Sequence, residues 1–371
     1  MLGANERSDW GNLVKISVVR RIQISRGVSL AVRFLSVIAA LVLGAVLLAL
    51  LGHSPAAVYS ELIAGAVGSV TRTRETVKIA VPLLGAALAI TPAFKMRFWN
   101  IGAEGQILAG GIAASYFALF WIGRMPAALL LMVMFVAAIA AGGIWGLIPA
   151  VFRAKWDTNE TLFTLMLNYI ILGLITFLQN GPWKSPTSTF PQIPMFHASL
   201  YLPKVLGVHF GWIFFLLLVV GMYVYMTKTR QGYELGAVGG SVEAARYAGV
   251  NVEKTMLRTM LLSGGICGAV GFFQVAGANY TLTQNTGGGV GFTAITVAWL
   301  AGLNPFAMVP ICLFLAVLQK GAGAIQTTFG IPASASEVLT GLILFCMLAG
   351  EFFLRYRLVR NQVAKEAKID G

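Results

Sequence analysis

The chain has 371 residues, of which 57% are hydrophobic and only 11% are charged, and its formal net charge is +13. A soluble domain carries charge at about a quarter of its positions, so the polar residues are too few to face water on all sides. Long apolar runs without alternation exclude a strand-built barrel and predict membrane-spanning helices. The basic residues lie between these runs, where they indicate membrane topology rather than nucleic-acid binding.

The predicted fold is all-α: a polytopic membrane protein with about ten transmembrane helices, since an apolar helix needs about 20 residues to cross the hydrocarbon core. No early apolar core marks a cleavable signal peptide, so the first span is expected to be an uncleaved anchor. The expected spans are residues 34–51, 79–94, 104–122, 127–151, 162–178, 212–226, 256–276, 292–303, 306–318 and 338–353.

Basic residues also predict the orientation, because cytoplasmic loops carry the excess of Lys and Arg. Most of the 27 basic residues face the cytoplasm if the N-terminus lies inside, and an even number of spans then puts the C-terminus inside too. The predicted organisation is a cytoplasmic tail (1–33), a transmembrane domain (34–353) and a second cytoplasmic tail (354–371). Within the domain, residues 179–210 form a proline-rich external loop and residues 227–255 a cytoplasmic loop.

Catalytic and metal-binding motifs are missing from the sequence. The dipeptide Gly-Lys, which a phosphate-binding loop needs, does not occur, so ATP chemistry would have to come from another polypeptide. Cys267, Cys312 and Cys346 lie in predicted spans without a CxxC partner and are interpreted as packing residues. The sequence therefore predicts no enzymatic site, no metal and no cofactor of its own.

The first of two glycine-interrupted segments is residues 100–106, NIGAEGQ, which leads into an apolar helix. An ionisable group inside a membrane is costly and usually faces a cavity, so Glu104 is the most informative residue here. The alternative is an ordinary helix start, at which a carboxylate is favoured by the helix dipole. The residues predicted to line a transport path are Asn100, Gly102, Glu104, Gly105 and Gln106.

The second segment is residues 285–302, NTGGGVGFTAITVAWLAG, in the other half of the chain. Two such segments predict a transport site at the interface of an internal pseudo-repeat with broken helices. A flexible external loop before an ordinary span is the alternative. The predicted path residues here are Gly287, Gly289, Gly291 and Phe292.

Two further stretches have a predicted structural role. Residues 241–249, SVEAARYAG, are expected to form a short helix with Ser241 as N-cap and Gly249 as C-cap. Glycines at 264, 265, 268 and 271 permit close helix packing within one span.

Four stretches in order carry a family resemblance: residues 98–106 (FWNIGAEGQ), 159–170 (NETLFTLMLNYI), 232–251 (GYELGAVGGSVEAARYAGVN) and 289–302 (GVGFTAITVAWLAG). The chain resembles bacterial ABC-importer permeases of the ribose, branched-chain amino acid and nucleoside group. Within that group it is most similar to the nucleoside permeases that work with a lipoprotein binding protein. The resemblance covers most of the chain from about residue 77 to residue 353.

The resemblance implies a permease subunit in the bacterial inner membrane that translocates nucleosides by alternating access. It also implies ATPase subunits that bind the ATP, a second and usually different homologous permease chain, and an external solute-binding lipoprotein. Residues Glu243, Ala244, Ala245 and Gly249, with Arg246 between them, match the EAA-xxx-G coupling loop, although the usual Ile and Leu-Pro that end this motif are missing. Phe98, Trp99 or Phe292 are expected to contact the base of the substrate.

Other classes of function remain open at this point. An ion-coupled secondary carrier would share the spans and broken helices, but only Glu104 could serve as a coupling carboxylate. An ABC permease could also carry a simple sugar, a purine-like base or a flavin. A membrane-embedded enzyme would need a catalytic cluster that the sequence lacks.

Overall fold

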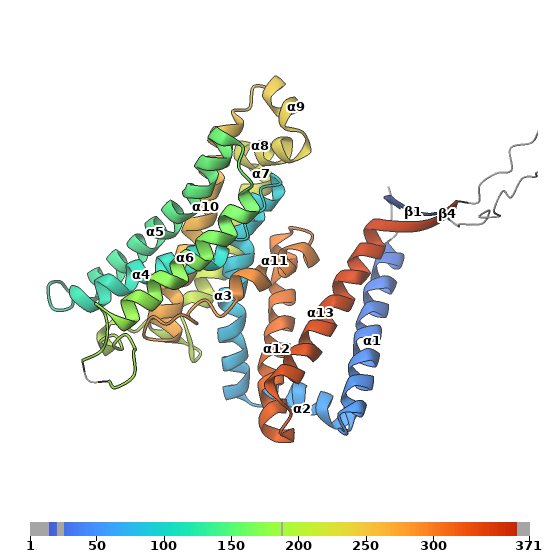
Figure 1. Ribbon diagram of the computed structural model, residues 1–371, viewed down its shortest axis with the longest axis horizontal. Helices are drawn as coiled ribbons and strands as arrows, with labels where there is room; N and C mark the ends of the chain where they lie inside the picture. The colour runs from blue at the N-terminus through green and yellow to red at the C-terminus, as the bar shows by residue number, and fades with distance from the viewer. Residues whose placement is uncertain (1–14, 21–25, 187, 362–371) are drawn as a thin grey trace, which may run out of the picture. The chain divides into compact units, whose positions relative to one another are not determined.

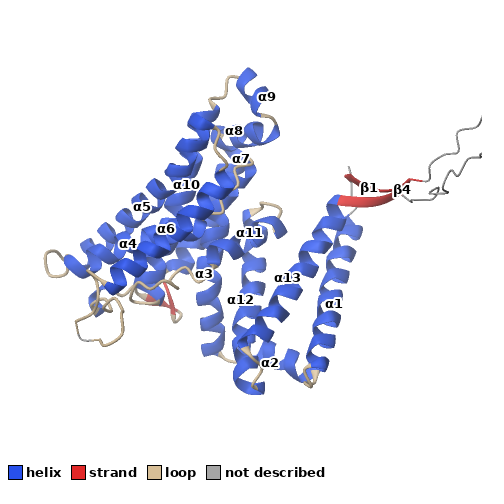
Figure 2. Cartoon of the chain, in the orientation of Figure 1, coloured by secondary structure: helices blue, strands red, loops and turns tan. Residues whose placement is uncertain are grey.

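The computed structural model describes residues 15–20, 26–186 and 188–361, and within them the chain forms thirteen α-helices and four short strands (Figures 1 and 2). Parts of the predicted tails, 1–33 and 354–371, lie outside the described residues. The chain divides into two compact units, Met1–Ala56 with Glu337–Gly371, and Ala57–Ser336. The predicted all-α class is confirmed.

The first unit pairs the beginning and the end of the chain. Helices α1 (Arg26–Leu50) and α13 (Ala333–Arg355) adjoin an antiparallel ribbon of β1 (Lys15–Arg20) and β4 (Tyr356–Asn361). Neither strand was expected from the sequence, and neither alternates strictly between apolar and polar residues. Because β1 precedes α1 and β4 follows α13, the ribbon brings the start of α1 near the end of α13.

The second unit is built around two helices that are almost entirely covered by protein. In the apolar windows of α3 and α10 83% of residues are buried, against 28–44% in the other spans. These two helices therefore form the centre, and the others turn one face to lipid. The unit contains α2 (Pro55–Val67), α3 (Val70–Lys95), α4 (Ala103–Phe120), α5 (Ala127–Trp156), α6 (Glu160–Asn180), α7 (Gly211–Lys228), α8 (Arg230–Gly240), α9 (Val242–Tyr247), α10 (Val252–Phe273), α11 (Val290–Leu300) and α12 (Pro305–Phe329).

Between α6 and α7 the predicted external loop holds a 3-10 turn (Ala198–Leu200) and a two-residue hairpin, β2 (Lys204–Val205) with β3 (Val208–His209). Helix α10 continues into a π-helical turn at Gln274–Ala278. Leu202 and Phe196 of the loop donate backbone hydrogen bonds to Ala276 and Tyr280. The loop is thereby fastened to the end of α10.

Glycines allow α10 to approach α5 and α4 closely, as the sequence predicts. A Cβ at Gly268 would overlap the carbonyl of Ala138 on α5, and one at Gly264 would overlap the carbonyl of Gly142. On the other side, a Cβ at Gly271 would overlap the Ile107 carbonyl of α4. Backbone thus packs on backbone, which suits helices that associate without a hydrophobic driving force.

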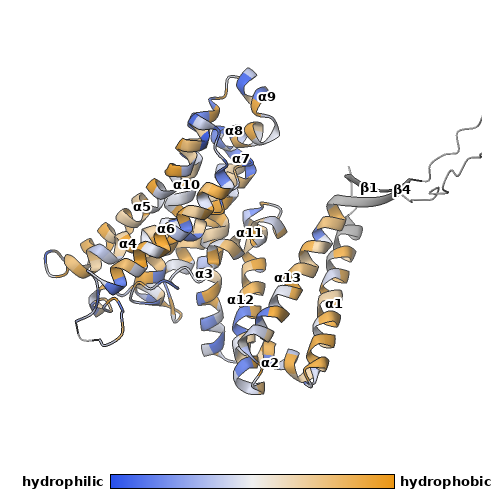
Figure 3. Ribbon diagram, in the orientation of Figure 1, coloured by the Kyte–Doolittle hydropathy of each residue, from blue (hydrophilic) through white to orange (hydrophobic). Residues whose placement is uncertain are grey.

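The predicted number of ten spans is not confirmed, although each predicted segment is helical. Among the described residues, seven helices are long and apolar enough to cross a membrane, or eight if the bent pair of α1 and α2 is one span. Helix α11 has 11 residues, about 16 Å of helix, which is too short to cross. Helix α4 carries two polar residues, Glu104 and Gln106, in its first turn. Figure 3 shows the mixed hydropathy of α8 and α9 against the apolar spans.

Replacing Gly268 with Ala should lower the thermal stability of the purified protein. The new methyl group collides with the Ala138 carbonyl, and overpacking of this kind costs about 1–3 kcal/mol. The matched control is Gly173→Ala in α6, where a Cβ meets open space and Ala favours the helix. Equal melting temperatures for the two variants, measured in detergent, would contradict the packing described here.

Candidate functional site

The turn between α3 and α4 is organised by the buried side chain of Asn100. Its Oδ1 accepts hydrogen bonds from Gly102 N (3.0 Å) and from Gln106 Nε2 (3.1 Å). Its Nδ2 donates to Gln106 Oε1 and to Ser263 Oγ on α10, both at 3.2 Å. Asn100 and Gln106 are 0% and 1% exposed, so this amide pair fixes the start of α4 on the central helix.

Helix α6 holds the same turn from the other side. Asn168 Oδ1 accepts from Gly105 N at 2.9 Å, and its Nδ2 donates to Ile101 O at 3.0 Å. Thr164 Oγ1 accepts from Ile101 N at 3.3 Å. Sequence reasoning did not identify Asn168, Thr164 or Ser263 as site residues. A polar side chain within an otherwise apolar span is the signal that could have found Asn168.

Glu104 joins the two glycine-interrupted segments directly. Its Oε1 accepts a hydrogen bond from Gly289 N (3.0 Å) and its Oε2 one from Gly291 N (2.7 Å). Gly289 is the N-cap of α11 and has φ of +73°, a conformation that favours glycine. The carboxylate therefore caps α11 rather than its own helix and faces the positive end of the α11 dipole.

Glu104 can approach this segment closely only because the facing residues are glycines. A Cβ at Gly287 would overlap the Glu104 carboxylate, and a Cβ at Gly291 would overlap the Glu104 backbone. Glu104 is 6% exposed, and among the described residues no ion pair involves it. Backbone N–H groups stabilise the buried charge, and we call this arrangement the Glu104 latch.

Aromatic side chains lie beside these segments. Trp99 stacks on Trp299 of α11 with ring centroids 5.6 Å apart, and Phe94 lies 5.7 Å from Trp99. Trp99 and Phe292 are each 44% exposed and can receive a ligand from outside the chain. Phe98 cannot do so in this conformation, because it is 3% exposed and packs toward α8 and α9.

The short helix predicted at 241–249 is present as α9. Ser241 Oγ accepts from Ala244 N (3.2 Å) as the N-cap and donates to Glu243 Oε2 (2.9 Å). Gly249, with φ of +79°, lies one residue past the C-cap Ala248. The predicted helix and its N-terminal cap are confirmed, and its C-terminal cap is displaced by one residue.

Helix α9 has one buried and one exposed face. Ala245 is 2% exposed and belongs to an apolar cluster with Met96, Phe98, Val238 and other residues of α8 and α10. The outer face presents Glu243, Ala244 and Arg246, as well as Tyr247, which is 94% exposed. Sequence reasoning missed Tyr247. A tyrosine exposed to this degree makes little contact with the rest of the described chain.

Helix α8 is tied to α10 by ion pairs. Glu234 accepts from Arg258 Nη2 of α10 at 2.9 Å and from Arg230 Nε at 3.1 Å. The hydrogen bond from Arg258 is the main reason that the pKa of Glu234 lies below its usual value. The segment that carries α9 is therefore fastened to the central helix.

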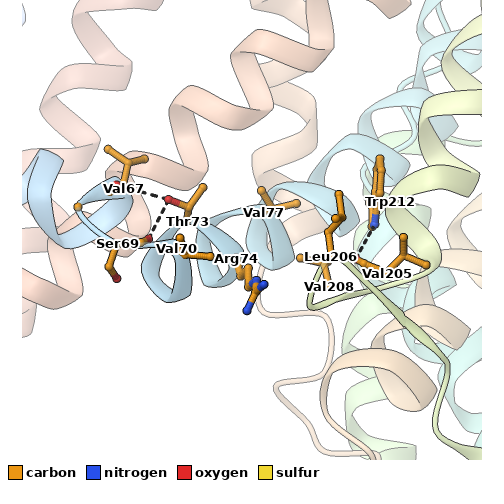
Figure 4. Close-up of a pocket in the computed structure, with 11 residues that line it drawn as sticks. Val67, Ser69, Val70, Thr73, Arg74, Val77, Val205, Leu206, Val208 and Trp212 are labelled. Atoms are coloured by element: carbon orange, nitrogen blue, oxygen red, sulfur yellow. Dashed lines mark hydrogen bonds between the residues drawn. The ribbon is translucent and has the colours of Figure 1, made fainter.

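A cavity of about 610 Å³ lies at the opposite end of α3 (Figure 4). Val67, Val70, Val77 and Leu206 give it an apolar lining, and Arg74 lies at the same wall. Trp212 Nε1 donates to Val205 O at 3.3 Å and closes the side formed by the hairpin. None of the predicted path residues lines this cavity.

Next to this hairpin, His209 is buried against the end of α10. It is 1% exposed, and its ring lies 6.1 Å from that of Phe273. Nδ1 accepts from Gly211 N at 3.2 Å, whereas Nε2 has no partner among the described residues. Burial first, and then the charge of Lys78, lower the pKa of His209 to about 4.

These features define a class: a multi-pass membrane protein in which the starts of two helices, α4 and α11, meet at a buried carboxylate, and in which a capped helix is exposed. Residues 73–348 match the family "Branched-chain amino acid transport system / permease component", and the chain belongs to this family of ABC permeases. Members are transport components rather than the ATPases that drive them. No solved structure matches the chain.

The similar proteins differ in their cargo. The chain is 37% identical to the glucose ABC transporter permease protein TsgB13 of Haloferax volcanii, over 87% of this chain and 88% of that protein. It is 31% identical to the guanosine ABC transporter permease protein NupP of Bacillus subtilis, over 88% and 95%. It is 30% identical to the nucleoside ABC transporter permease protein NupB of Lactococcus lactis, over 91% and 95%.

The stability of the protein should depend on pH through His209. An unfolded histidine takes up a proton below about pH 6.5, whereas His209 stays neutral until about pH 4. The contribution of the buried, neutral imidazole to the free energy of unfolding is present at pH 7 and is lost as the pH falls from 6.5 to 4. At pH 5 the free energy of unfolding is lower by about 2 kcal/mol for this reason. Thermal unfolding at pH 7 and pH 5 should show a smaller loss for His209→Gln than for wild type.

The control for this measurement is His197→Gln, because His197 lies in the same loop but is exposed. Parallel pH profiles for wild type and His209→Gln would show that burial of the imidazole does not contribute to this stability.

Proposed function

We propose that the chain is one of two permease subunits of an ATP-driven importer in a bacterial inner membrane, and that its cargo is a nucleoside. Membership of the family supports the permease role, and the guanosine and nucleoside permeases among the relatives support the cargo. It further takes α9 to be the element on which a partner ATPase acts. The observation that carries it is a continuous series of contacts from α9 to the Glu104 latch.

The series begins where α9 packs on the α3–α4 turn. Ala245 and Phe98 share one buried cluster, and Asn100 N donates to Phe98 O at 3.0 Å. Asn100 then links Gln106 in the first turn of α4 to Ser263 of α10. Glu104 lies between Asn100 and Gln106 in sequence, so a displacement of α9 reaches the carboxylate through packed and hydrogen-bonded groups. Packed interfaces switch between discrete arrangements rather than deforming continuously.

Alternating access follows from the chemistry of the latch. While Glu104 caps α11, the Gly287–Gly291 segment is held against α4. When the two hydrogen bonds break, the glycine backbone is free to adopt another arrangement. The path residues Asn100, Gly102, Glu104, Gly105, Gln106, Gly287, Gly289, Gly291 and Phe292 lie along or next to this contact. Trp99 and Phe292, both partly exposed, are available to contact a flat base.

The partners in this proposal are an ATPase subunit beneath α9, a second and different permease chain, and an external solute-binding lipoprotein. The outer face of α9 supports the first of these. A cleft of about 370 Å³ beside α9 is lined by Arg97, Arg153, Glu160 and Glu243 among others. Tyr247 beside it supplies an exposed aromatic of the kind that dominates interface energies.

A hexose is the second candidate cargo, because the relative from Haloferax volcanii is a glucose permease with 37% identity. Aromatic faces and hydrogen-bonding side chains suit a pyranose as well as a nucleoside. The two candidates differ in the base, which only the nucleoside can stack on an aromatic ring. Competition between the two solutes therefore separates them.

The test is uptake of radiolabelled guanosine by cells that express the permease with its ATPase, second permease and binding protein. Wild type should take up guanosine in an ATP-dependent manner, and unlabelled uridine but not glucose should compete. Tyr247→Ser should lower uptake about tenfold, as loss of a central aromatic anchor does. Because the Tyr247 side chain is 94% exposed, its removal leaves the fold of the permease itself intact.

The matched control is Tyr169→Ser, which removes another exposed tyrosine side chain (63% exposed) within the span α6, away from the sides on which the ATPase and the binding protein would dock. Its uptake should equal that of wild type. Uptake of glucose in place of guanosine would discard the nucleoside cargo and keep the permease. Unchanged uptake by Tyr247→Ser would reject the docking of a partner on α9.

A further inference from the structure

A long groove between α5, α7 and α10 takes no part in the predicted transport path. Its volume is about 660 Å³, within the range of ligand pockets, which is roughly 300–1,000 Å³. Most of its lining is apolar, including Phe214, Leu218 and Met222 of α7 and Ile266 of α10. One end is polar and is lined by Tyr225, Gln231 and Arg258.

The surface around the groove is suited to hydrocarbon. Only 28% of the apolar window of α7 is buried, and Leu217, Val220 and Val224 on the same helix are 67%, 50% and 45% exposed. In a membrane this surface faces acyl chains. An apolar groove that opens among such residues is filled by an apolar chain, because water gains no hydrogen bonds there.

The polar end of the groove is positively charged. Glu234 is shared by two guanidinium groups, those of Arg230 and Arg258, so the three groups together keep one positive charge. Lys228 at the end of α7 adds an exposed ammonium group, whereas the charge of Lys254 at the start of α10 is balanced by its exposed neighbour Glu253. Charge complementarity therefore favours an anionic headgroup.

Hydrogen-bond donors are also left over at this end. Arg258 Nε is buried without an acceptor among the described residues, and the Tyr225 hydroxyl lies near the guanidinium without a well-oriented hydrogen bond. Arg258 uses Nη2 for Glu234, and its side chain is 30% exposed, so the exposed part of its guanidinium can donate to another oxygen. A phosphate group matches such a fork.

We propose that this groove binds one anionic phospholipid, with an acyl chain along α7 and α10 and its phosphate at Arg258 and Tyr225. The assignment to the cytoplasmic leaflet rests on the proposed function, which puts α8 and α9 inside. Basic pockets between transmembrane helices on that side are typical sites for anionic headgroups. Because Arg258 also holds α8 through Glu234, lipid composition would act on the segment that carries α9.

The test is lipid binding by the purified transporter, which needs no transport activity and so stands apart from the test of the proposed function. The complex is delipidated, incubated with mixed micelles of phosphatidylglycerol and phosphatidylcholine, repurified and analysed by mass spectrometry. Wild type should retain phosphatidylglycerol. Gly221→Leu should retain several-fold less, because Gly221 lines the groove and its Cβ position is open, so the new side chain fills the groove without a clash.

The matched control is Gly173→Leu, at an equally open position within α6, which should bind lipid as wild type does. For the headgroup, Arg258→Gln should lower the preference for phosphatidylglycerol about tenfold, the effect of one charge-assisted hydrogen bond. Lys155→Gln removes one exposed positive charge at the end of α5 that neither lines the groove nor pairs with Glu234, and it should keep the preference.

Three outcomes would overturn the proposal. The first is equal binding of both lipids by wild type, which would show that the groove does not select an anionic headgroup. The second is equal phosphatidylglycerol binding by wild type and Gly221→Leu, which places the lipid elsewhere. The third outcome combines two results: the wild-type complex binds no lipid, and the Gly221→Leu complex separates into single chains. These results would show that the groove is an interface between permease chains.

Discussion

The structure of the site depends on a single constraint: a carboxylate buried within a membrane protein must be compensated locally. Glu104 is 6% exposed, and an unpaired buried charge is strongly unfavourable. Its compensation comes from two backbone N–H groups at the start of α11, at 3.0 and 2.7 Å. This interaction explains why the facing segment is rich in glycine, since side chains at Gly287 and Gly291 would occupy the space of Glu104.

The hydrogen bonds that compensate the buried Glu104 carboxylate are compatible with a transport function. Charge-assisted hydrogen bonds contribute about 1.5–3 kcal/mol each, enough to hold one conformation and within reach of a conformational change driven by ATP. The central helices α3 and α10 are held more firmly, because 83% of their apolar windows is buried and α10 packs backbone against backbone through its glycines. Mobility is therefore expected in the short α11 and its glycine-rich approach rather than in the centre of the bundle.

Much of the architecture could be predicted because the local amino-acid composition of a segment indicates whether it forms a membrane helix. Each apolar run became a helix, and Ser241 caps α9 as its sequence indicates. The number of spans could not be predicted in the same way, since whether α11 crosses the membrane depends on its length, which the loop before it sets. The ribbon of β1 and β4 brings together residues from the two ends of the chain, and local patterns do not record such pairing.

The candidate site, like the fold, could be predicted only in part. Sequence reasoning identified Glu104 and the glycines of both segments, but not that they contact each other, because that contact joins residues 185 and 187 positions apart. Asn168 and Ser263 were missed for the same reason: each matters through a partner on another helix. Phe98 was expected at the substrate and instead links α9 to the α3–α4 turn.

Hydrogen exchange at the Gly289 and Gly291 amides tests the central claim, that motion of α9 opens and closes the Glu104 latch. The assembled transporter is compared without nucleotide and with ATP trapped in its ATPase subunits, and exchange is followed in peptides that cover residues 285–292. The account predicts that these amides are protected in one state and exchange at least tenfold faster in the other, about 1.4 kcal/mol of lost protection. Equal protection in both states, in a transporter that hydrolyses ATP and takes up its cargo, would contradict it.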